Sequence, residues 1–253
     1  MNSPSPNPYR ARFYRRQAEW HGCAGVEAVE AHHKQRAPYY AWYSRGWLPP
    51  SKDAAALDIG CGAGQFLYFL RQQGYTNSIG VDTDAEQVAL AGQLDLKAHC
   101  ADVLQFLSQD RARYDLISLL DVLEHFTLSE AFPLLHAVVD HLAPAGAVIL
   151  SVPNAESPGG FATRHADITH EIAFTATSLA EMLFCHGLTI SDIRDPFPAP
   201  VSPLRIVYRR LVQICRLLEA LRLRALGLGP PGVWSPVVWA RAVRSVPEQP
   251  QQP

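Results

Sequence analysis

The sequence predicts an α/β fold, a doubly wound and mostly parallel sheet of seven strands with helices between them. Short apolar runs alternate along the chain with stretches of helical apolar spacing, a pattern typical of a sheet that helices cover on both faces. One of these runs, residues 54–59, leads directly into three glycines, Gly60, Gly62 and Gly64. The length of 253 residues suffices for one such domain with an accessory element.

Residues 54–70, AAALDIGCGAGQFLYFL, are expected to form a buried strand, a tight turn and a helix that begins at Gln65. Such a junction is where α/β sheets hold an adenosine-bearing ligand. A Cβ atom in the turn would collide with the ligand or strain the backbone, and the helix N-terminus favours an anionic group such as a carboxylate. The third glycine comes one residue earlier than in the G-x-G-x-x-G pattern of dinucleotide folds, which disfavours a dehydrogenase.

The remaining elements follow from the same kinds of pattern. Six more strands are expected at 78–81, 96–99, 114–120, 147–152, 188–193 and 233–243, with a turn at 144–146. Helices are expected at 85–92, 131–142 and 178–185, and another begins near Asp102. For the helix at 178–185, Ser178 is the expected N-cap and Glu181 completes the capping-box spacing.

The ends of the chain differ from its middle. Residues 9–47 mix aromatic and basic side chains and predict one or two helices that cap the sheet, from which Arg36 and Tyr40 could reach a bound ligand. We therefore divide the chain into a tail with capping helices at 1–48, the main domain at 49–246, and a tail at 247–253. The tail, like residues 1–8, is expected to be disordered.

Composition excludes several classes of function. The net charge of −2 gives no support for extensive nucleic-acid binding. Five cysteines without a C-x-x-C pair indicate neither a zinc cluster nor a disulfide framework, so a reducing cytoplasm is expected. The N-terminus lacks the apolar region of a secretory signal, and no apolar run approaches the ~20 residues of a membrane span.

Acidic residues stand at the ends of the predicted strands, the edge where open α/β sheets bind ligands. Asp82 ends the second strand, where nucleotide folds place a carboxylate that accepts both ribose hydroxyls. The alternative role of Asp82 is a helix N-cap, which Thr83 or Asp84 could fill equally well. We favour the ribose role.

The fourth predicted strand delivers Asp121, Glu124 and His125 to the same edge. A long polar segment, residues 155–176, follows the fifth strand and contains several histidines and acids. A loop of this length inside a compact domain is usually functional or disordered, and its composition indicates a functional one.

Residues 203–228 predict an arginine-rich helix inserted before the last strand. Apolar residues recur at helical spacing from Leu204 to Leu221, while Arg205, Arg209 and Arg216 share another face. The segment has six arginines and one acid, Glu219. Three interpretations stay open: a cap over the substrate mouth, which we favour, a dimer helix, and a basic helix that lies on anionic lipid.

Several motifs, in order, resemble those of the class I S-adenosylmethionine-dependent methyltransferases, which have a Rossmann-like fold. The motifs are LDIGCGAG at 57–64, GVDTD at 80–84, CADV at 100–103, YDLISLLDVLEHF at 114–126 and DITHEIAFTATSLAEML at 167–183. Within that family the chain is most similar to bacterial enzymes associated with glycan and surface-polysaccharide synthesis, and more distantly to the ubiquinone O-methyltransferases.

The resemblance implies S-adenosylmethionine as cofactor and S-adenosylhomocysteine as product. It implies that Asp82 holds the ribose and that Asp102 accepts a hydrogen bond from the adenine amino group, with an N-cap as the alternative role of Asp102. The cofactor-binding residues implied in this way are Asp58, Gly60, Cys61, Gly62, Gly64, Asp82, Thr83, Asp102, Val103, Leu120 and Asp121.

Methyl transfer from a sulfonium is an in-line displacement, for which an enzyme aligns the acceptor and excludes water. A hydroxyl acceptor must lose its proton, and histidine suits that role. The candidate bases are His125 and His170, which stand beside the carboxylates Glu124 and Glu171. Asp121 and Glu124 join them as candidate catalytic residues.

Two other interpretations concern the same residues. On a helical turn Asp121, Glu124 and His125 would share a face, and with Asp167 or His170 they could hold a divalent cation, as a similar stretch in the ubiquinone methyltransferases suggests. In a purely structural interpretation Asp121 caps the helix, Glu124 bonds backbone amides and His125 has a structural role. We favour a histidine base over both. Five other histidines are expected to need nothing beyond solvent: His21, His32, His33, His136 and His141.

The sequence thus predicts a methyltransferase that acts on a sugar hydroxyl of a glycan or glycan precursor. One alternative is O-methylation of a membrane-borne quinol or phenol, with the helix at 203–228 on the lipid surface. Another is a partner subunit that binds S-adenosylmethionine without catalysis. The expected partners are the acceptor and, in the first alternative, the inner face of the membrane, but no nucleic acid.

Overall fold

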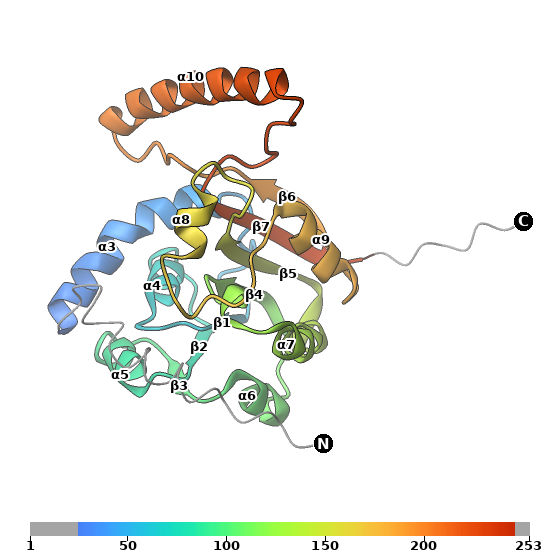
Figure 1. Ribbon diagram of the computed structural model, residues 1–253. Coiled ribbons are helices and arrows are strands. Elements are labelled where there is room, and N and C mark those ends of the chain that lie inside the picture. Colours follow the sequence, from blue (N-terminus) through green and yellow to red (C-terminus); the bar gives the residue numbers. More distant parts are fainter. Residues whose placement is uncertain (1–24, 246–253) are drawn as a thin grey trace, which may run out of the picture.

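A computed structural model describes residues 25–245, which form a seven-stranded sheet in the order β3-β2-β1-β4-β5-β7-β6 (Figure 1). The strands are β1 (Ala56–Ile59), β2 (Ser78–Asp82), β3 (Ala98–Cys100), β4 (Tyr114–Leu120), β5 (Leu142–Pro153), β6 (Leu188–Arg194) and β7 (Val237–Arg244). Neighbours from β3 to β5 are parallel, whereas β7 is antiparallel to both β5 and β6. The predicted α/β fold with a mostly parallel, seven-stranded sheet is confirmed. The tails expected at 1–8 and 247–253 lie outside the described residues.

Helices connect and cover the strands (Figure 1). They are α3 (Val26–Tyr43), α4 (Gln65–Gln72), α5 (Ala85–Gln93), α6 (Val103–Gln109), the 3₁₀ turn η1 (Leu123–His125), α7 (Leu128–His141), α8 (Gly160–Arg164), α9 (Ala176–Phe184) and α10 (Pro203–Ala225). No helix within 25–245 is long and apolar enough to cross a membrane.

The core lies on both faces of the sheet because successive residues of a strand point to opposite sides. In β4, Leu116 packs with α3 and α4, whereas the next residue, Ile117, packs with α6, α7 and α9. Ile149 and Val148 of β5 divide in the same way. Burial on both faces explains why the sequence of β4 is almost continuously apolar rather than alternating.

Three elements, β3, α7 and β7, begin at 98, 128 and 237 rather than at the expected 96, 131 and 233. Local signals were misread at two further places. The expected turn at 144–146 is a bulge inside β5: Tyr114 pairs with Leu142 and Leu116 pairs with Ala147, so β5 uses extra residues between the two pairs. The N-cap of α9 is Thr175, whose hydroxyl accepts a hydrogen bond from the Ser178 amide at 3.1 Å, not Ser178 itself. Ser178 completes the capping box in place of Glu181, because a hydroxyl three residues after the cap can reach the cap amide.

His33 also differs from expectation. It is 1% exposed, and its ring packs at 5.3 Å (centroid to centroid) from Tyr68. Burial lowers the pKa of His33 to about 4, so this histidine is neutral at physiological pH. It belongs to the contact between α3 and α4 rather than to the solvent-exposed surface.

Candidate functional site

The glycine turn after β1 has the backbone that its composition predicts. Gly60 and Gly62 have φ values of +67° and +52°, a region that side chains with a Cβ rarely adopt. A Cβ on Gly60 would stand 2.5 Å from Cγ2 of Val122, so packing against the protein itself already requires this glycine. At Gly62 the nearest atom is 3.8 Å away, which leaves the middle of the turn open.

Asp82 holds this turn in place. Its Oδ2 accepts a hydrogen bond from the Gly62 amide at 2.7 Å, and its Oδ1 accepts one from the Asp84 amide at 2.8 Å. The N-cap of α5 is Asp84, which accepts from the amides of residues 86 and 87, so the capping role considered for Asp82 is wrong. Thr83, between them, is exposed. Burial raises the pKa of Asp82, although the amide hydrogen bonds oppose the rise.

Two of the implied cofactor residues are buried beneath the turn. Asp58 is 3% exposed and accepts a hydrogen bond from the Ser118 hydroxyl at 2.6 Å. Burial raises the pKa of Asp58 to about 7, despite that hydrogen bond. Cys61 is buried too, and burial raises the pKa of its thiol, so it is not a nucleophile. The Cys61 side chain packs against β2, where a Cβ on Gly80 would stand 2.5 Å from its Sγ.

Asp102 and Val103 lie at the start of α6. Asp102 is the N-cap, and its Oδ1 accepts a hydrogen bond from the Gln105 amide at 3.0 Å. The capping alternative for Asp102 is therefore confirmed, while its role toward adenine stays a prediction. Val103 is buried and Asp102 is exposed, and both follow the carboxyl end of β3, close to that of β2.

Helix α3 brings two more side chains to this edge. The Tyr40 hydroxyl donates to Oε1 of Gln65, the first residue of α4, at 3.0 Å. The guanidinium of Arg36 lies 5.7 Å from the centre of the Tyr40 ring. The Arg36 charge also counteracts the rise in the pKa of Asp121, which places both near each other.

Asp121 follows β4 in a left-handed conformation with φ of +55°, which is uncommon for a residue other than glycine. Its Oδ1 accepts from the Ser151 hydroxyl at 2.9 Å, and its amide donates to the Ser151 carbonyl at 3.0 Å. Desolvation of the carboxyl by the surrounding protein raises the pKa of Asp121, although the residue as a whole is exposed to solvent. Leu120, just before it, is half-buried. Such strain at a strand end is typical of ligand-binding sites.

The polar loop between β5 and α9 is fixed against η1. The amides of Glu171 and Ile172 both donate to the Glu124 carbonyl, at 2.7 and 3.1 Å. The rings of His125 and His170 consequently lie 4.8 Å apart, centre to centre. Ligand atoms of Glu124, His125 and His170 all lie within 4.8 Å of one another. Two predicted bases that are far apart in sequence therefore meet.

The hydrogen bonds assign the tautomers of both histidines. The Thr169 hydroxyl donates to Asp167 at 2.7 Å, so it accepts from Nδ1 of His125 at 2.8 Å. Nδ1 of His170 donates to the Arg164 carbonyl at 3.0 Å. In the neutral rings Nε2 then carries the lone pair. Burial alone would raise the pKa of Asp167, but the hydrogen bonds from Thr169 outweigh it and the pKa is lowered. The Asp167 carboxylate, at the end of this series of hydrogen bonds, therefore stays charged.

Glu124 has a different environment. It is 1% exposed, and within residues 25–245 neither of its carboxylate oxygens has a hydrogen-bond partner. Burial, reinforced by the charge of Asp121, raises the pKa of Glu124 well above its usual value. The carboxylate thus lacks the well-formed bonds to backbone amides that the structural interpretation expected, although the amide of Glu124 itself opposes the rise in its pKa. A buried carboxyl without a partner is rare and points to a ligand, ion or water that completes it.

The donor set for a cation differs from the one expected. Asp121 lies before η1 in a left-handed conformation and bonds Ser151, so it does not share a helical face with Glu124 and His125. It does not cap η1 either, since Val122 occupies that position. The group that the structure brings together consists of Glu124, His125 and His170, three residues of the expected set. One carboxylate and two imidazoles suit Zn²⁺ or another transition metal better than Mg²⁺.

Three supporting residues were missed from sequence: Ser118, Ser151 and Thr169. Each donates a hydroxyl hydrogen bond to a carboxylate at the carboxyl edge. The two serines interrupt apolar strands, and a polar residue in such a strand was the available signal. Thr169 gave none beyond its place between Asp167 and His170.

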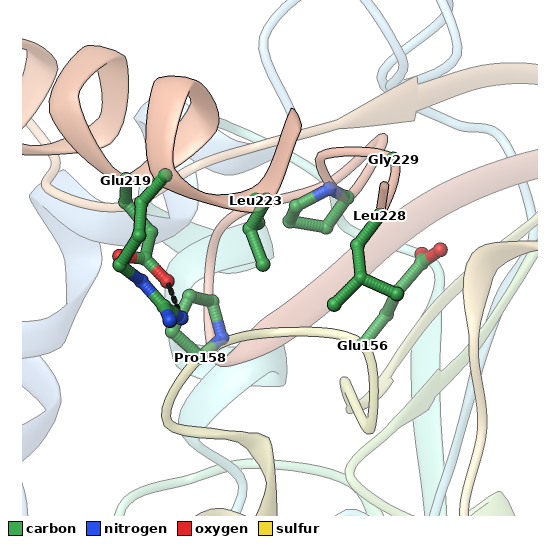
Figure 2. A pocket seen from close by; sticks show the side chains of 8 residues that line it. Glu156, Pro158, Glu219, Leu223, Leu228 and Gly229 are labelled. Carbon is green, nitrogen blue, oxygen red and sulfur yellow. Dashed lines mark hydrogen bonds and ion pairs between the residues drawn. The ribbon is translucent and has the colours of Figure 1, made fainter. Parts of the chain in front are cut away.

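A cavity of about 400 Å³ lies apart from these residues, between α10 and the segment that follows β5 (Figure 2). Arg222 and Glu219 of α10 form an ion pair of 2.7 Å at one side of it. None of the predicted site residues lines it. Its lining consists of Glu156, Pro158, Glu219, Arg222, Leu223, Leu228, Gly229 and Pro231.

A family model described as a methyltransferase domain matches residues 31–192, and no curated protein matches the sequence. A SAM-dependent methyltransferase from Archaeoglobus fulgidus is 18% identical, with 93% of this chain and 99% of that chain covered and a TM-score of 0.56. Magnesium protoporphyrin IX methyltransferase from Synechocystis, solved with bound SAM, is 17% identical, with 97% and 100% covered and a TM-score of 0.56. A methyltransferase from Clostridium acetobutylicum is 12% identical, with 95% and 100% covered and a TM-score of 0.57. At these identities the likeness shows a shared fold.

Proposed function

This chain belongs to the methyltransferase domain family, and from that premise we propose that it transfers a methyl group from S-adenosylmethionine to a sugar hydroxyl of a glycan or glycan precursor. When bound, the cofactor would supply a methyl group that its positive sulfur already activates. The chain's own residues must then hold the cofactor, align the acceptor and remove the hydroxyl proton. The sugar rests on the resemblance to glycan-associated methyltransferases.

Two features of the glycine turn support the cofactor. Helix α4 begins directly after Gly64, and no side chain among residues 25–245 caps its N-terminus, so its first amides can bind a carboxylate. The space at Gly62 is open, and the Asp82 carboxylate beside it has oxygen lone pairs beyond those that the two amides use. A carboxylate-bearing end and a ribose fit this arrangement.

The observation that carries the proposal is the pairing of His125 and His170. Their Nε2 atoms carry the lone pairs, and their rings lie 4.8 Å apart, centre to centre. The bonded series Asp167–Thr169–His125 orients one ring and stabilises it once it has taken a proton, because the carboxylate at its end stays charged. An imidazole so placed can accept the proton of a hydroxyl as the methyl group is transferred.

The proposal is tested first by binding and then by turnover. Calorimetry on the folded chain should detect S-adenosylmethionine and S-adenosylhomocysteine, and no heat with either would overturn the proposal. Incubation with methyl-labelled S-adenosylmethionine and fractionated cell extracts should then label a carbohydrate. Label on a quinol or phenol would instead favour the membrane-borne acceptor considered above.

Histidine variants test the base. His125→Ala and His170→Ala should each lower kcat, the more important one by roughly a hundredfold or more, without loss of cofactor affinity. His165→Ala is the matched control, since His165 is an exposed histidine of the same loop. If cofactor binds and no variant changes any turnover, the chain is better described as a non-catalytic partner subunit.

A bound cation is the second candidate, favoured by the partnerless carboxyl of Glu124. Removal of metal by a chelator should leave turnover unchanged if a histidine is the base. If the chelator abolishes activity and added Zn²⁺ or Mn²⁺ restores it, and if Glu124→Gln loses the bound metal, a metal ion rather than a histidine base would activate the acceptor.

A further inference from the structure

Helix α10 exposes an apolar stripe to its surroundings. Val207, Leu211, Ile214, Leu218 and Leu221 follow one another at spacings of four and three residues, so they lie on one face. Each is between 53% and 61% exposed, and Ala220 is the one buried residue of the helix. Figure 1 shows α10 along the outside of the molecule, beyond the helices that flank the sheet.

The opposite face of α10 attaches it to the protein through arginines. The guanidinium of Arg205 lies 5.1 Å from the centre of the Tyr39 ring, and that of Arg209 lies 5.4 Å from the Trp42 ring. Arg216 forms two hydrogen bonds, of 2.7 and 3.1 Å, with the Asp195 carboxylate. An amphipathic helix on a globular protein normally buries its apolar face, so α10 is inverted.

Positive charge borders the exposed stripe. On a helical projection Arg210 and Arg224 lie along one edge and Arg222 along the other. Within the part of the chain that the structure describes, the guanidinium groups of Arg210 and Arg224 make no hydrogen bond or ion pair, although the Arg224 carbonyl accepts from the Gly227 amide. Glu219 is the one acid of α10, and Arg222 already engages it.

We propose that α10 binds the surface of an anionic membrane, with the stripe among the outer acyl chains and Arg210 and Arg224 at the lipid phosphates. Apolar residues bordered by arginines are the pattern of helices that lie in the membrane interface. The helix is too charged to cross the bilayer, so it lies in the plane of the surface. This inference does not depend on the methyl acceptor.

A second copy of the chain fits the stripe less well. With Leu204, which is exposed and lies three residues before Val207, the stripe spans about two and a half heptads, fewer than the three or four that identify a coiled coil. Two such helices side by side would also bring arginines together, with a single, already paired acid on each. Lipid phosphates supply the negative charge that a second copy lacks.

Flotation with vesicles tests the proposal on the full chain. The protein should rise with vesicles of equal parts phosphatidylcholine and phosphatidylglycerol and stay at the bottom with phosphatidylcholine alone, and added salt should weaken the binding. Absence of flotation with either, or equal flotation with both, would overturn it.

Variants locate the surface. Leu218→Asp should lower the vesicle partition coefficient at least tenfold, because burial of one leucine contributes about that factor, whereas Phe184→Asp, at an exposed apolar residue of α9, should leave it unchanged. Arg210→Gln with Arg224→Gln should lower it roughly thirtyfold. The matched pair Lys97→Gln with Arg111→Gln removes the same charge from exposed residues elsewhere and should have little effect.

Light scattering supplies the competing outcome. The chain should be monomeric without lipid. A dimer that Leu218→Asp converts to monomer would assign the stripe to a second copy and overturn the membrane proposal. Equal losses of partition from the α10 double variant and from the Lys97 and Arg111 double variant would also do so, since the attraction would then depend on total charge rather than on α10.

Discussion

The carboxyl edge of the sheet and helix α10 arrange polar and apolar side chains in opposite ways. At the edge, Asp58 and Glu124 are buried carboxyls, 3% and 1% exposed. In α10 the leucines are outside and Arg216 is held against the protein. Burial of a charged group costs free energy, and exposure of an apolar stripe loses the stabilisation that its burial would give. Both regions therefore lower the stability of the fold. Regions of this kind usually serve binding.

The largest effect should come from Gly60→Ala. An alanine at φ of +67° is strained, and its Cβ would stand 2.5 Å from Val122. Strain and overpacking together should lower the free energy of unfolding by about 3 kcal/mol, measured by urea denaturation. Gly92→Ala, in α5 with no atom within 4 Å of the new Cβ, should be neutral or slightly stabilising. Equal losses in both would mean that the glycine turn is not specially packed.

Asp58→Asn should stabilise the protein in a pH-dependent manner. The carboxyl ionises near pH 4 in the unfolded chain and near pH 7 in the folded one, so its ionisation favours unfolding as pH rises through this window. The shift sets an upper limit of roughly 4 kcal/mol, and since relaxation relieves part of such a cost we expect a gain of about 2 kcal/mol above pH 7.

Below about pH 4 both states of the wild type bind the proton, so Asp58→Asn should then change stability little. Chemical denaturation across the pH range measures the difference. A gain that is the same at every pH would show that burial of the charge is not its cause.

Within α10, loss of Arg216 should lower the free energy of unfolding more than loss of an exposed leucine. Arg216→Ala removes a two-bond contact with Asp195 whose side chains are 20% and 25% exposed, and should cost about 1.5 kcal/mol of unfolding free energy. Arg222→Ala breaks an ion pair whose arginine is 60% exposed and should cost less than about 0.5 kcal/mol. A larger loss of unfolding free energy from Arg222→Ala would contradict the proposed division of α10 into a face attached to the protein and an exposed face.

The smallest effect should come from Leu218→Ser, which should change the unfolding free energy by less than about 0.5 kcal/mol. Leu218 is 61% exposed and belongs to none of the core clusters that the described residues form. Leu183→Ser in α9, where the leucine is fully buried, is the matched comparison and should cost at least about 2 kcal/mol. A similar cost at both positions would mean that the stripe of α10 is packed against the protein in solution.

Most of the fold could be predicted because local patterns report it directly. Burial on both faces makes β4 a continuous apolar run, and its bounds, 114–120, match the prediction. Helix α4 begins at Gln65 as the glycines require. Signals that depend on a single side chain were less informative: Thr175 and Ser178 are both good caps, and only the path of the preceding loop decides between them.

The site was predicted in its members more than in its geometry. Both histidines were identified, but a helical turn was assumed where η1 and the left-handed Asp121 exist, so the wrong carboxylate joined the group. The orientation of α10 was equally inaccessible. Apolar spacing reveals that a helix has two faces, whereas the contacts of Arg205 and Arg216 with distant residues determine which one turns inward.

The route of the chain around α10 has an evolutionary consequence. The chain leaves the sheet at Arg194 and returns at Val237 on the neighbouring strand, where Arg194 pairs with Trp239. Asp195 closes this exit by accepting hydrogen bonds from the amides of residues 234 and 235. The excursion is thus held at its base independently of the parallel half of the sheet, so we expect its length and sequence to vary among members of the family more than those of β1 to β5.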